Sequence, residues 1–388
     1  MRKKSKGAIT LAILLMSMYL NVENVISLML VEIQRDFPAL SLMTIQKIPS
    51  NVNLIETVAM LWVGWLTSKI NKRKIIIIFQ GGTVLGAMMG YFFGSSFGML
   101  YFSFLVLGVS CGIIGTIARS ATVELFSQEE MPKIMALSQI ANTLGTSFLQ
   151  ILGGYLITIS WRAGFLSFLI GLLSMFSAVF LLPDGPLEVR GQKGKNANRP
   201  KIWTKHLVHD IVLTVLVLSI SSAYTTNITF LVDERGLGDT VIAGYLSSVR
   251  TIAMFFAALA LPWIVKVTKK QIITVSGGWM LAGYLIVAYS RNIWGIAVGS
   301  LIAGFGMGTF TPAIFLHVAK HVQQNTNAMS HAWVSLAGTL GLYLYPYLIL
   351  APSMLLGETS TNRLQVAMIW LVLLMIGEIL FEAKEKEY

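Results

Sequence analysis

The stretch Lys74–Gly94, KIIIIFQGGTVLGAMMGYFFG, decides how this chain folds. After its first residue it carries no charge, and nearly all of its side chains are apolar or small. About 20 residues of this kind form a helix long enough to cross a hydrocarbon core of about 30 Å. The stretch therefore predicts a transmembrane helix.

Comparable apolar stretches recur along the whole chain, which has 388 residues, 55% of them hydrophobic and only 12% charged. Soluble domains carry about 25% charged residues, so water is not the main solvent of this protein. We expect an all-α membrane protein with twelve transmembrane helices, approximately at residues 7–31, 46–67, 74–94, 97–123, 133–158, 162–182, 207–231, 240–265, 271–290, 292–319, 327–353 and 362–381.

Little chain remains for a soluble domain, and this limits the classes of function. No Gly-x-x-x-x-Gly-Lys-Ser/Thr phosphate loop is present, so ATP is not expected to drive the protein directly. The only cysteine, Cys111, lies inside a predicted span, and no nucleophile–base pair or group of metal ligands is visible. We therefore expect neither an enzyme nor a bound cofactor or metal.

The net charge of +11 comes from basic residues that gather in alternate short loops, which explains the charge better than nucleic-acid binding does. Short loops rich in Lys and Arg stay on the cytoplasmic side of a membrane. We therefore expect a multi-pass protein of the cytoplasmic membrane with both termini in the cytoplasm. Arg363 is counted among the six basic residues expected on the opposite side.

A basic segment rich in Gly, Asn and Pro divides six predicted spans from the other six. Such a composition is typical of a loop or linker. The predicted organisation is an N-terminal six-helix bundle over 1–182, a cytoplasmic linker over 183–206 and a C-terminal six-helix bundle over 207–388.

Glycine patterns of the first half recur in the second half at a constant separation of 196 residues. The pairs lie on three different spans: Gly81-Gly82 with Gly277-Gly278, Gly108 and Gly112 with Gly304 and Gly308, and Thr143-Leu144-Gly145 with Thr339-Leu340-Gly341. A constant separation over separate helices indicates an internal repeat. The two bundles are therefore predicted to be pseudo-symmetric, a plan known among secondary transporters.

The loop after the second span, GWLTSKINKR at 64–73, resembles the cytoplasmic signature of the major facilitator superfamily. That signature has Gly, three residues, Asp, Arg or Lys, one residue, Gly and two basic residues. The positions assigned to this gate motif are Gly64, Ser68, Lys69, Lys72 and Arg73, with Ser68 in place of the acid. Asn71 replaces the second glycine, and asparagine tolerates the left-handed turn that glycine supplies. The resemblance implies that the acid helps to close the cytoplasmic side, so here another contact must do so.

The resemblance covers nearly the whole chain. The fifth span, from Gly145 to Gly154, is similar to the Gly-rich signature of antiporters in this superfamily. Drug antiporters of the superfamily usually carry an Arg early in the fourth span, where this chain has Phe104. The resemblance implies two bundles that rock about a site near the middle of the membrane, and we expect a monomer.

Ionisable side chains inside spans are candidates for a functional role, because placing each one at the bilayer centre costs about 2.5–3.5 kcal/mol. Arg250, near the middle of the eighth span, could bind an anionic solute or form an ion pair between helices. Glu56 could carry a coupling proton or pair with Arg250. Glu23 either lines a cavity or makes a packing hydrogen bond. Asn53 shares a helix face with Glu56 and is the position that a 197-residue offset pairs with Arg250.

Tyr224, Asn227 and Trp333 could line a solute pocket, although aromatic residues of membrane helices are more often packing or interface anchors. Three histidines are expected near the cytoplasmic surface as interface residues: His317, His321 and His331.

The predicted function is transport of a small organic solute across the cytoplasmic membrane by alternating access, best described as proton-coupled transport of an organic anion. In that scheme Arg250 binds the anion, and Glu56 or Glu23 carries the proton. One alternative is multidrug efflux by drug/proton antiport, which the fifth span favours and which Phe104 and Arg250 disfavour. The other is a transporter-like solute sensor, which the shortness of the linker disfavours.

Overall fold

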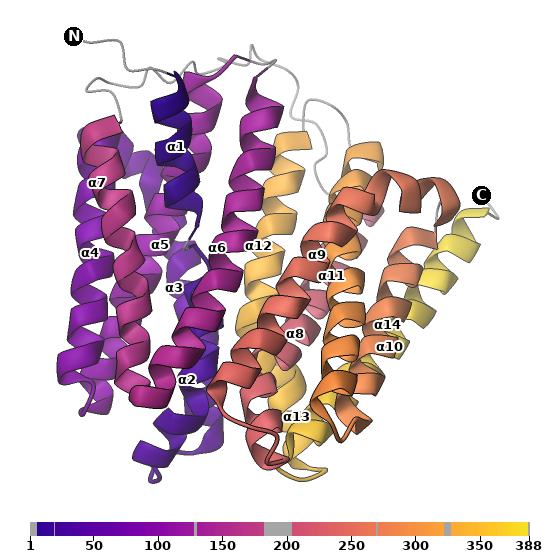
Figure 1. Cartoon of the computed structure of the whole chain (residues 1–388). Helices are drawn as coiled ribbons and strands as arrows, with labels where there is room; N and C mark the ends of the chain where they lie inside the picture. Colours follow the sequence, from indigo (N-terminus) through magenta and orange to yellow (C-terminus); the bar gives the residue numbers. More distant parts are fainter. Residues whose placement is uncertain are drawn as a thin grey trace. The chain divides into compact units, whose positions relative to one another are not determined.

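A computed structural model describes residues 6–18, 20–127, 130–181, 204–268, 271–321 and 327–386. Over these ranges the chain is built from helices, as Figure 1 shows, and it contains no strand. The all-α class is confirmed. By its internal contacts the chain divides into two compact units, Met1–Lys193 and Gly194–Tyr388. Most of the predicted linker, up to residue 203, lies outside the described residues.

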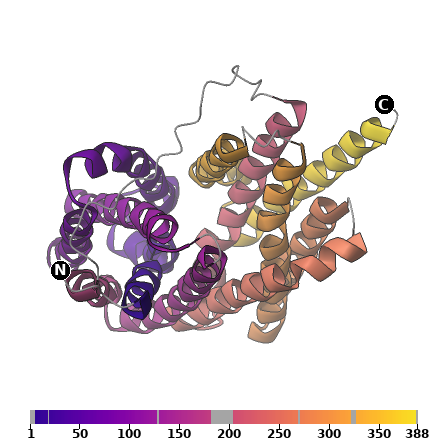
Figure 2. The ribbon, with the colours of Figure 1, turned by 90° about the horizontal axis from the view of Figure 1, so that it is seen from above.

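The described residues of the first unit form seven α-helices and one 3-10 helix. They are α1 (Lys6–Ser17), α2 (Val22–Asp36), α3 (Leu42–Lys69), α4 (Lys72–Phe93), α5 (Phe97–Leu125), α6 (Met131–Ile159), η1 (Trp161–Ile170) and α7 (Gly171–Leu181). Figure 2 looks down on this unit, coloured indigo to magenta, with its helices nearly end on.

The second unit repeats this arrangement, but its first helix, α8, is continuous. Its elements are α8 (Lys205–Glu234), α9 (Thr240–Thr268), α10 (Ile272–Tyr289), α11 (Ile293–His321), α12 (Asn327–Tyr345), the π-helical η3 (Pro346–Leu350), α13 (Ala351–Met354) and α14 (Ser360–Lys386). The expected span over 327–353 therefore changes its helical type at Pro346, which has no N–H to continue the α-helical pattern.

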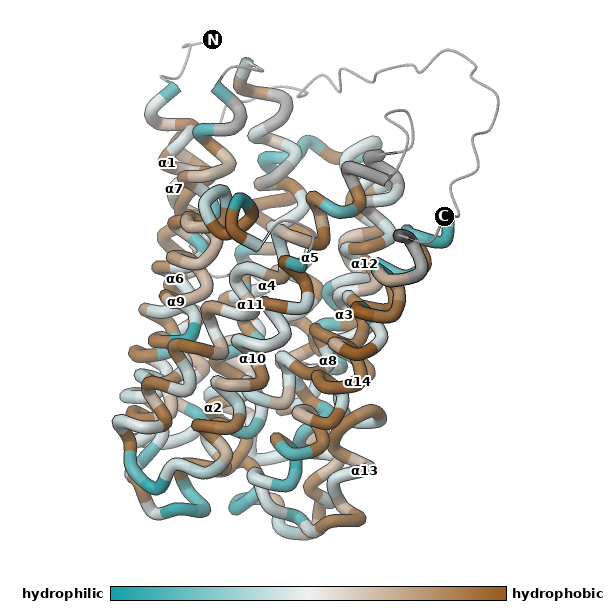
Figure 3. The backbone as a smooth tube through the Cα atoms, turned by 90° about the vertical axis from the view of Figure 1, so that its right-hand side faces the viewer, coloured by the Kyte–Doolittle hydropathy of each residue, from teal (hydrophilic) through white to brown (hydrophobic). Residues whose placement is uncertain are grey.

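Eleven helical segments of the described residues are long and apolar enough to cross a membrane. The long helix outside that set is α3, with 28 residues. Polar side chains in its middle, among them Asn53 and Glu56, lower its mean hydropathy. With α3 the described helices make twelve crossings, as predicted. In Figure 3 hydrophobic colours dominate the middle of the helices.

The first crossing is broken, whereas the sequence predicted one helix over 7–31. Its two parts, α1 and α2, are separated at residues 18–21 and together form a candidate span of 31 residues, Lys6–Asp36. Asn21 stands at the N-cap of α2, a position that favours asparagine. Its side chain does not cap the helix because it donates hydrogen bonds to α6 instead.

The two units make the same close backbone approaches at equivalent glycines. A Cβ on Gly112 would collide with the carbonyl of Glu56, and one on Gly308 would collide with the carbonyl of Met254. Likewise, Gly145 lies against the Met18 carbonyl and Gly341 against the Val215 carbonyl. Small residues allow such approaches between membrane helices. The pseudo-symmetry predicted from the sequence is therefore visible inside each unit.

These contacts also correct one predicted equivalence. Gly108 packs against the carbonyl of Val52, and Gly304 packs against that of Arg250. Because Gly108 and Gly304 are a repeat pair, Val52 is the counterpart of Arg250 in the first unit. Asn53, which the 197-residue offset had matched to Arg250, lies one residue further along α3. The offset failed because it was taken from the loop motifs, whose spacing differs from that of the helices.

Candidate functional site: a polar cavity in the first unit

A cavity of about 600 Å³ lies within the first unit, among α1, α3, α5, α6 and the break before α2. Its lining is rich in hydroxyl and amide side chains and includes one carboxylate. The lining residues are Ser17, Leu20, Asn21, Glu56, Gly115, Ala118, Ser120, Thr122, Met135, Ser138, Gln139 and Asn142. A pocket of this size with several convergent polar groups is the usual form of a small-molecule site.

Asn21 and Asn142 organise one wall of the cavity. The Asn21 amide donates to Asn142 Oδ1 at 3.1 Å and to Thr146 Oγ1 at 2.9 Å. The Asn142 amide donates to the backbone carbonyl of Ser17 at 3.0 Å. Two amides and one hydroxyl are thereby fixed at the place where the first crossing is broken. Sequence reasoning missed both asparagines, although amides inside apolar spans were the available signal.

Glu56 is the acid of the cavity wall, and Glu23 lies close by in the first turn of α2. The Asn24 amide donates to Glu23 Oε1 at 3.1 Å. The thiol of the fully buried Cys111 on α5 lies within electrostatic range of both carboxylates. The two predicted proton-coupling residues thus converge on one region of the first unit, and Glu56 is the one that lines the cavity.

The second unit has a cavity at the equivalent position, with about 230 Å³ between α8, α11 and α12. Gly338 stands 196 residues after Asn142. On the first helices the repeat glycines Gly145 and Gly341 lie against Met18 and Val215, a separation of 197, so Leu218 stands where the first unit has Asn21. The wall is accordingly mostly apolar, with Leu218, Phe310, Ile314, Phe315, Val334 and Leu342. Polar recognition groups are therefore concentrated in the first cavity.

Arg250 and Tyr224, both predicted to contact solute, are brought together in the interior of the second unit. The Arg250 guanidinium lies over the Tyr224 ring, 4.8 Å from its centroid. It donates to Ser221 Oγ at 2.5 Å and to Thr225 Oγ1 at 3.2 Å. Tyr224 in turn donates to Ser300 Oγ at 2.5 Å. Arg250 is 6% exposed and lines neither of the two cavities.

Asn227 belongs to a second buried network, centred on Arg363. Arg363 donates to Asn227 Oδ1 at 2.8 Å, and the Asn227 amide donates to the Tyr345 hydroxyl at 2.7 Å. Arg363 is 1% exposed and also lies 5.5 Å from the centre of the Phe230 ring. Arg363 lies within α14, which begins at Ser360, and its side chain is buried inside the second unit, which its charge alone did not indicate.

The other two predicted solute contacts lie apart from the cavity. Asn53 is buried in α3, and the cavity lining does not include it. Trp333, at the start of the membrane part of α12, is 38% exposed. Of the residues predicted to bind solute or to couple protons, Glu56 alone lines one of the two described cavities.

The gate-motif residues make contacts inside the first unit. Lys72 donates to Ser120 on α5 at 3.3 Å, and Arg73 donates to the Val179 carbonyl on α7. Ser68 donates to the Trp65 carbonyl of its own helix at 2.7 Å. Lys69 is exposed, and a Cβ on Gly64 would meet open space.

Asn71 does not adopt the left-handed turn expected for it. It has φ −60° and ψ 133°, and its side chain accepts from the Arg73 N–H. Asn71 is thus the N-cap of α4, so the loop needs a helix cap at this position and no positive φ.

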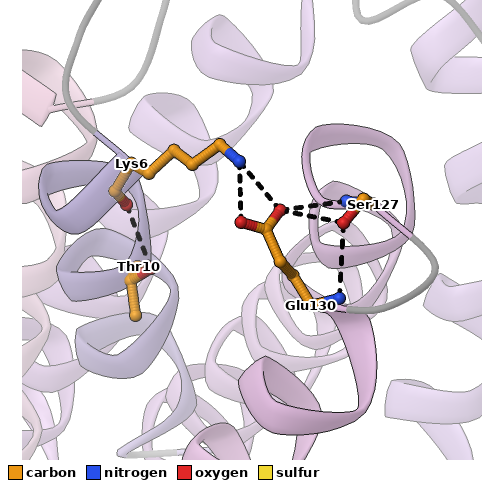
Figure 4. Close-up of polar contacts among 4 residues, drawn as sticks. All are labelled: Lys6, Thr10, Ser127 and Glu130. Carbon is orange, nitrogen blue, oxygen red and sulfur yellow. Dashed lines mark hydrogen bonds and ion pairs between the residues drawn. The ribbon is translucent and has the colours of Figure 1, made fainter.

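An exposed ion pair joins the start of α1 to the residue preceding α6, as Figure 4 shows. The Lys6 ammonium lies 2.7 Å from Glu130 Oε1. Ser127 donates its hydroxyl to Glu130 Oε2 at 3.1 Å. These bonds lower the pKa of the Glu130 carboxyl, with the hydrogen bond from Lys6 as the main cause.

Comparison with known proteins agrees with this architecture. The family model of the Major Facilitator Superfamily matches residues 11–346, while no curated protein matches the sequence. The nucleoside transporter NupG is similar in structure with a TM-score of 0.74, 13% identity, and coverage of 97% of this chain and 98% of that chain. A D-xylose-proton symporter is similar with a TM-score of 0.76 and 12% identity, and the match covers 96% of this chain and 97% of that chain.

A POT family transporter in complex with 5-aminolevulinic acid gives a TM-score of 0.77 at 13% identity, with 98% of this chain and 96% of that chain covered. Identities this low show a shared fold and leave the solute open to argument from the site itself. The family match over most of the sequence and the twelve crossings lead to one assignment: this chain belongs to the Major Facilitator Superfamily and is a multi-pass membrane transporter.

Proposed function

We propose that the protein is a secondary transporter whose first-unit cavity binds a small polar solute that carries several hydrogen-bond donors. The observation that carries this proposal is the cavity lining, in which Asn21, Gln139, Asn142 and Glu56 supply acceptor oxygens. Its described lining includes no Lys, Arg or His. A neutral polyhydroxyl solute or an amine suits this wall better than a carboxylate does, because buried polar groups need complementary partners.

Glu56 is proposed as the residue that carries the coupling proton. It is the acid of the cavity, so its charge acts directly on whatever binds there. Ion-gradient coupling also fits a chain without a phosphate loop. The D-xylose-proton symporter and the nucleoside transporter with the same fold are named for solutes rich in hydroxyl groups, which is compatible with such a wall.

An organic anion is a second candidate, and a separate observation favours it. Arg250 is a buried cation held by two hydroxyls and an aromatic ring. Its Nε atom has no hydrogen-bond partner among the described residues. A guanidinium placed in this way retains donors for a carboxylate or another oxyanion.

The two candidates are separated by binding assays on the protein in lipid nanodiscs, with panels of polyols, nucleosides, amines and small carboxylates. Under the first proposal, Asn142→Leu weakens binding of the solute by about tenfold or more, as the loss of one or two polar contacts implies. Arg250→Lys leaves that affinity unchanged. Under the second proposal, Arg250→Lys weakens binding of the solute and Asn142→Leu leaves its affinity unchanged. Ser335→Ala, at the position that corresponds to Gln139, is the matched control in the other unit.

The role of Glu56 is tested in proteoliposomes with the solute found in this way. Glu56→Gln should abolish accumulation driven by a proton gradient while exchange of solute across the membrane at equal pH continues. Accumulation by Glu56→Gln at the wild-type rate would remove Glu56 from the coupling step without affecting the cavity assignment.

A further inference from the structure

A buried group of acids and histidines lies in the second unit, away from both cavities. It joins Asp210 and His209 near the start of α8 to His317 near the end of α11 and to Glu378 near the end of α14. Asp210 is 0% exposed and Glu378 is 2% exposed. Acids so deeply buried inside membrane helices are expensive, and they mark functional positions more often than packing positions.

The contacts form a chain across three helices. Glu378 Oε2 lies 3.1 Å from His209 Nε2, and His209 Nδ1 lies 3.8 Å from Asp210 Oδ1. Asp210 Oδ1 lies 2.8 Å from His317 Nδ1. The sequence prediction had treated His317 as an interface residue. The structure instead pairs it with an acid that the sequence separates from it by 107 residues.

The arrangement fits a protonated imidazole. His209 stands between two carboxylates and stacks on Phe381, with ring centroids 3.9 Å apart and an angle of 8° between the rings. An imidazolium gains from both acids and from the aromatic face. If the histidines lose their protons, two buried carboxylates remain without compensating charge, which is costly in a low-dielectric interior.

The helices around this group carry other charged or titratable residues. They are Lys205 and His206 on α8, Lys266 on α9, Lys320 and His321 on α11, His331 on α12 and Glu382 on α14. Lys205 and Lys266 lie at exposed positions. His206 packs by its ring against His317 and Phe381. No three His, Cys, Asp or Glu side chains of the described residues are arranged to hold a metal ion.

Polar atoms inside the group remain unsatisfied. Asp210 Oδ2, His209 Nδ1 and Glu378 Oε2 are buried and have no hydrogen-bond partner among the described residues, so the contact between His209 and Glu378 is an ion pair without hydrogen-bond geometry. Buried polar atoms without a partner are unfavourable, so they mark a place where a proton or a small hydrogen-bonding species gains energy by binding. The ligand suggested by a donor set of two acids and two imidazoles is the proton.

We propose that Asp210, His209, His317 and Glu378 form a proton-binding clasp that holds the start of α8 against the ends of α11 and α14. Proton uptake gives each carboxylate a cationic partner and closes the clasp. Proton release leaves the buried acids repelling each other, so the three helix ends separate. The clasp lies outside the polar cavity of the first unit, and it acts whatever solute that cavity binds.

Hydrogen–deuterium exchange of the full-length protein in nanodiscs tests the clasp. Rates are divided by the intrinsic rate at each pH, and α10, which contains no acidic or basic residue, serves as the internal reference. From pH 6 to pH 9 we expect protection of segments 205–212 and 374–383 to fall by about tenfold or more, a change of the size expected for local opening linked to one proton. Protection that does not change with pH in the wild type would overturn the proposal.

Two variants separate a proton clasp from a merely structural contact. His209→Gln/His317→Gln keeps a hydrogen-bonding side chain at both positions but neither can take up a proton, so its exchange at pH 6 should match that of the wild type at pH 9. The double variant Asp210→Asn/Glu378→Gln has no buried charge and should lose the pH dependence. Asp239→Asn, an exposed acid before α9, is the matched control and should keep it. Wild-type pH dependence in His209→Gln/His317→Gln would also refute the clasp.

Discussion

Asn21, at the break between α1 and α2, donates a hydrogen bond to Asn142 on α6, with 3.1 Å between Nδ2 and Oδ1. Asn142 then donates to the carbonyl of Ser17, the last residue of α1. A helix end leaves carbonyls without intrahelical partners, and Asn142 supplies a donor for one of them. In the second unit Gly338 stands at this position, and α8 is unbroken. Asn142 thus contributes both to the end of the broken helix and to the polar wall of the cavity.

Replacing Asn142 with Leu should therefore affect both stability and binding. The variant leaves the Ser17 carbonyl and the Asn21 amide without this partner, at a cost of about 1–3 kcal/mol. We expect a lower melting temperature and weaker solute binding. Thr143→Val is the matched control, because Thr143 donates to the Gln139 carbonyl of its own helix and does not line the cavity. Equal effects of the two variants would contradict this role of Asn142.

Alanine at Gly145 should destabilise the first unit. The added Cβ would collide with the backbone of Met18, and backbone can move aside only by shifting α1 relative to α6, at a cost of about 1–3 kcal/mol. Gly64→Ala is the control, since that Cβ meets open space and alanine favours a helix by up to about 1 kcal/mol. Thermal unfolding in detergent measures both. A stable Gly64→Ala that transports slowly would show that the motif glycine acts during the transport cycle.

The Lys6–Glu130 pair should make stability depend on acidity. Because the pKa of Glu130 is lowered from its ordinary value of 4.5, the folded state holds its proton less tightly than the unfolded state. The stabilisation is therefore fully present above about pH 4.5, and it is lost as the pH falls through the lowered pKa.

Melting curves of the wild type and Glu130→Gln between about pH 7 and about pH 3 measure this contribution. The difference in melting temperature between the wild type and Glu130→Gln should be constant near neutral pH and shrink at acidic pH. It should also decrease in high salt, because the ion pair is exposed. A difference that grows on acidification has the wrong sign and would rule the ion pair out as its source.

Arg363 should be among the residues least tolerant of replacement in the second unit. Its removal leaves Asn227 Oδ1 and the Glu358 carbonyl without their donor, and hydrogen bonds from charged groups contribute about 1.5–3 kcal/mol each. Arg363→Ala should thus lower the melting temperature strongly, and Arg363→Lys only in part, because Lys lacks the planar fork. Arg291→Ala, at an exposed position, should be nearly neutral. Similar losses in Arg363→Ala and Arg291→Ala would contradict the buried network.

Apolar length and the 196-residue repeat determined the fold from the sequence alone: helices, twelve crossings and pseudo-symmetric halves. These properties depend on hydrophobicity and on small residues, which are local and can be read along the chain. Glu56 was also identified in this way, since an acid in an apolar helix is conspicuous wherever it sits.

Only the tertiary structure decided which side chains meet. Asn142 gains its role from the break between α1 and α2, and Arg363 of α14 is buried where it meets Asn227 of α8. Asp210 meets His317 across helices that lie far apart in the sequence. A polar side chain inside a membrane protein must find a partner, but the partner is chosen by helix rotation and crossing, which hydrophobic periodicity does not specify.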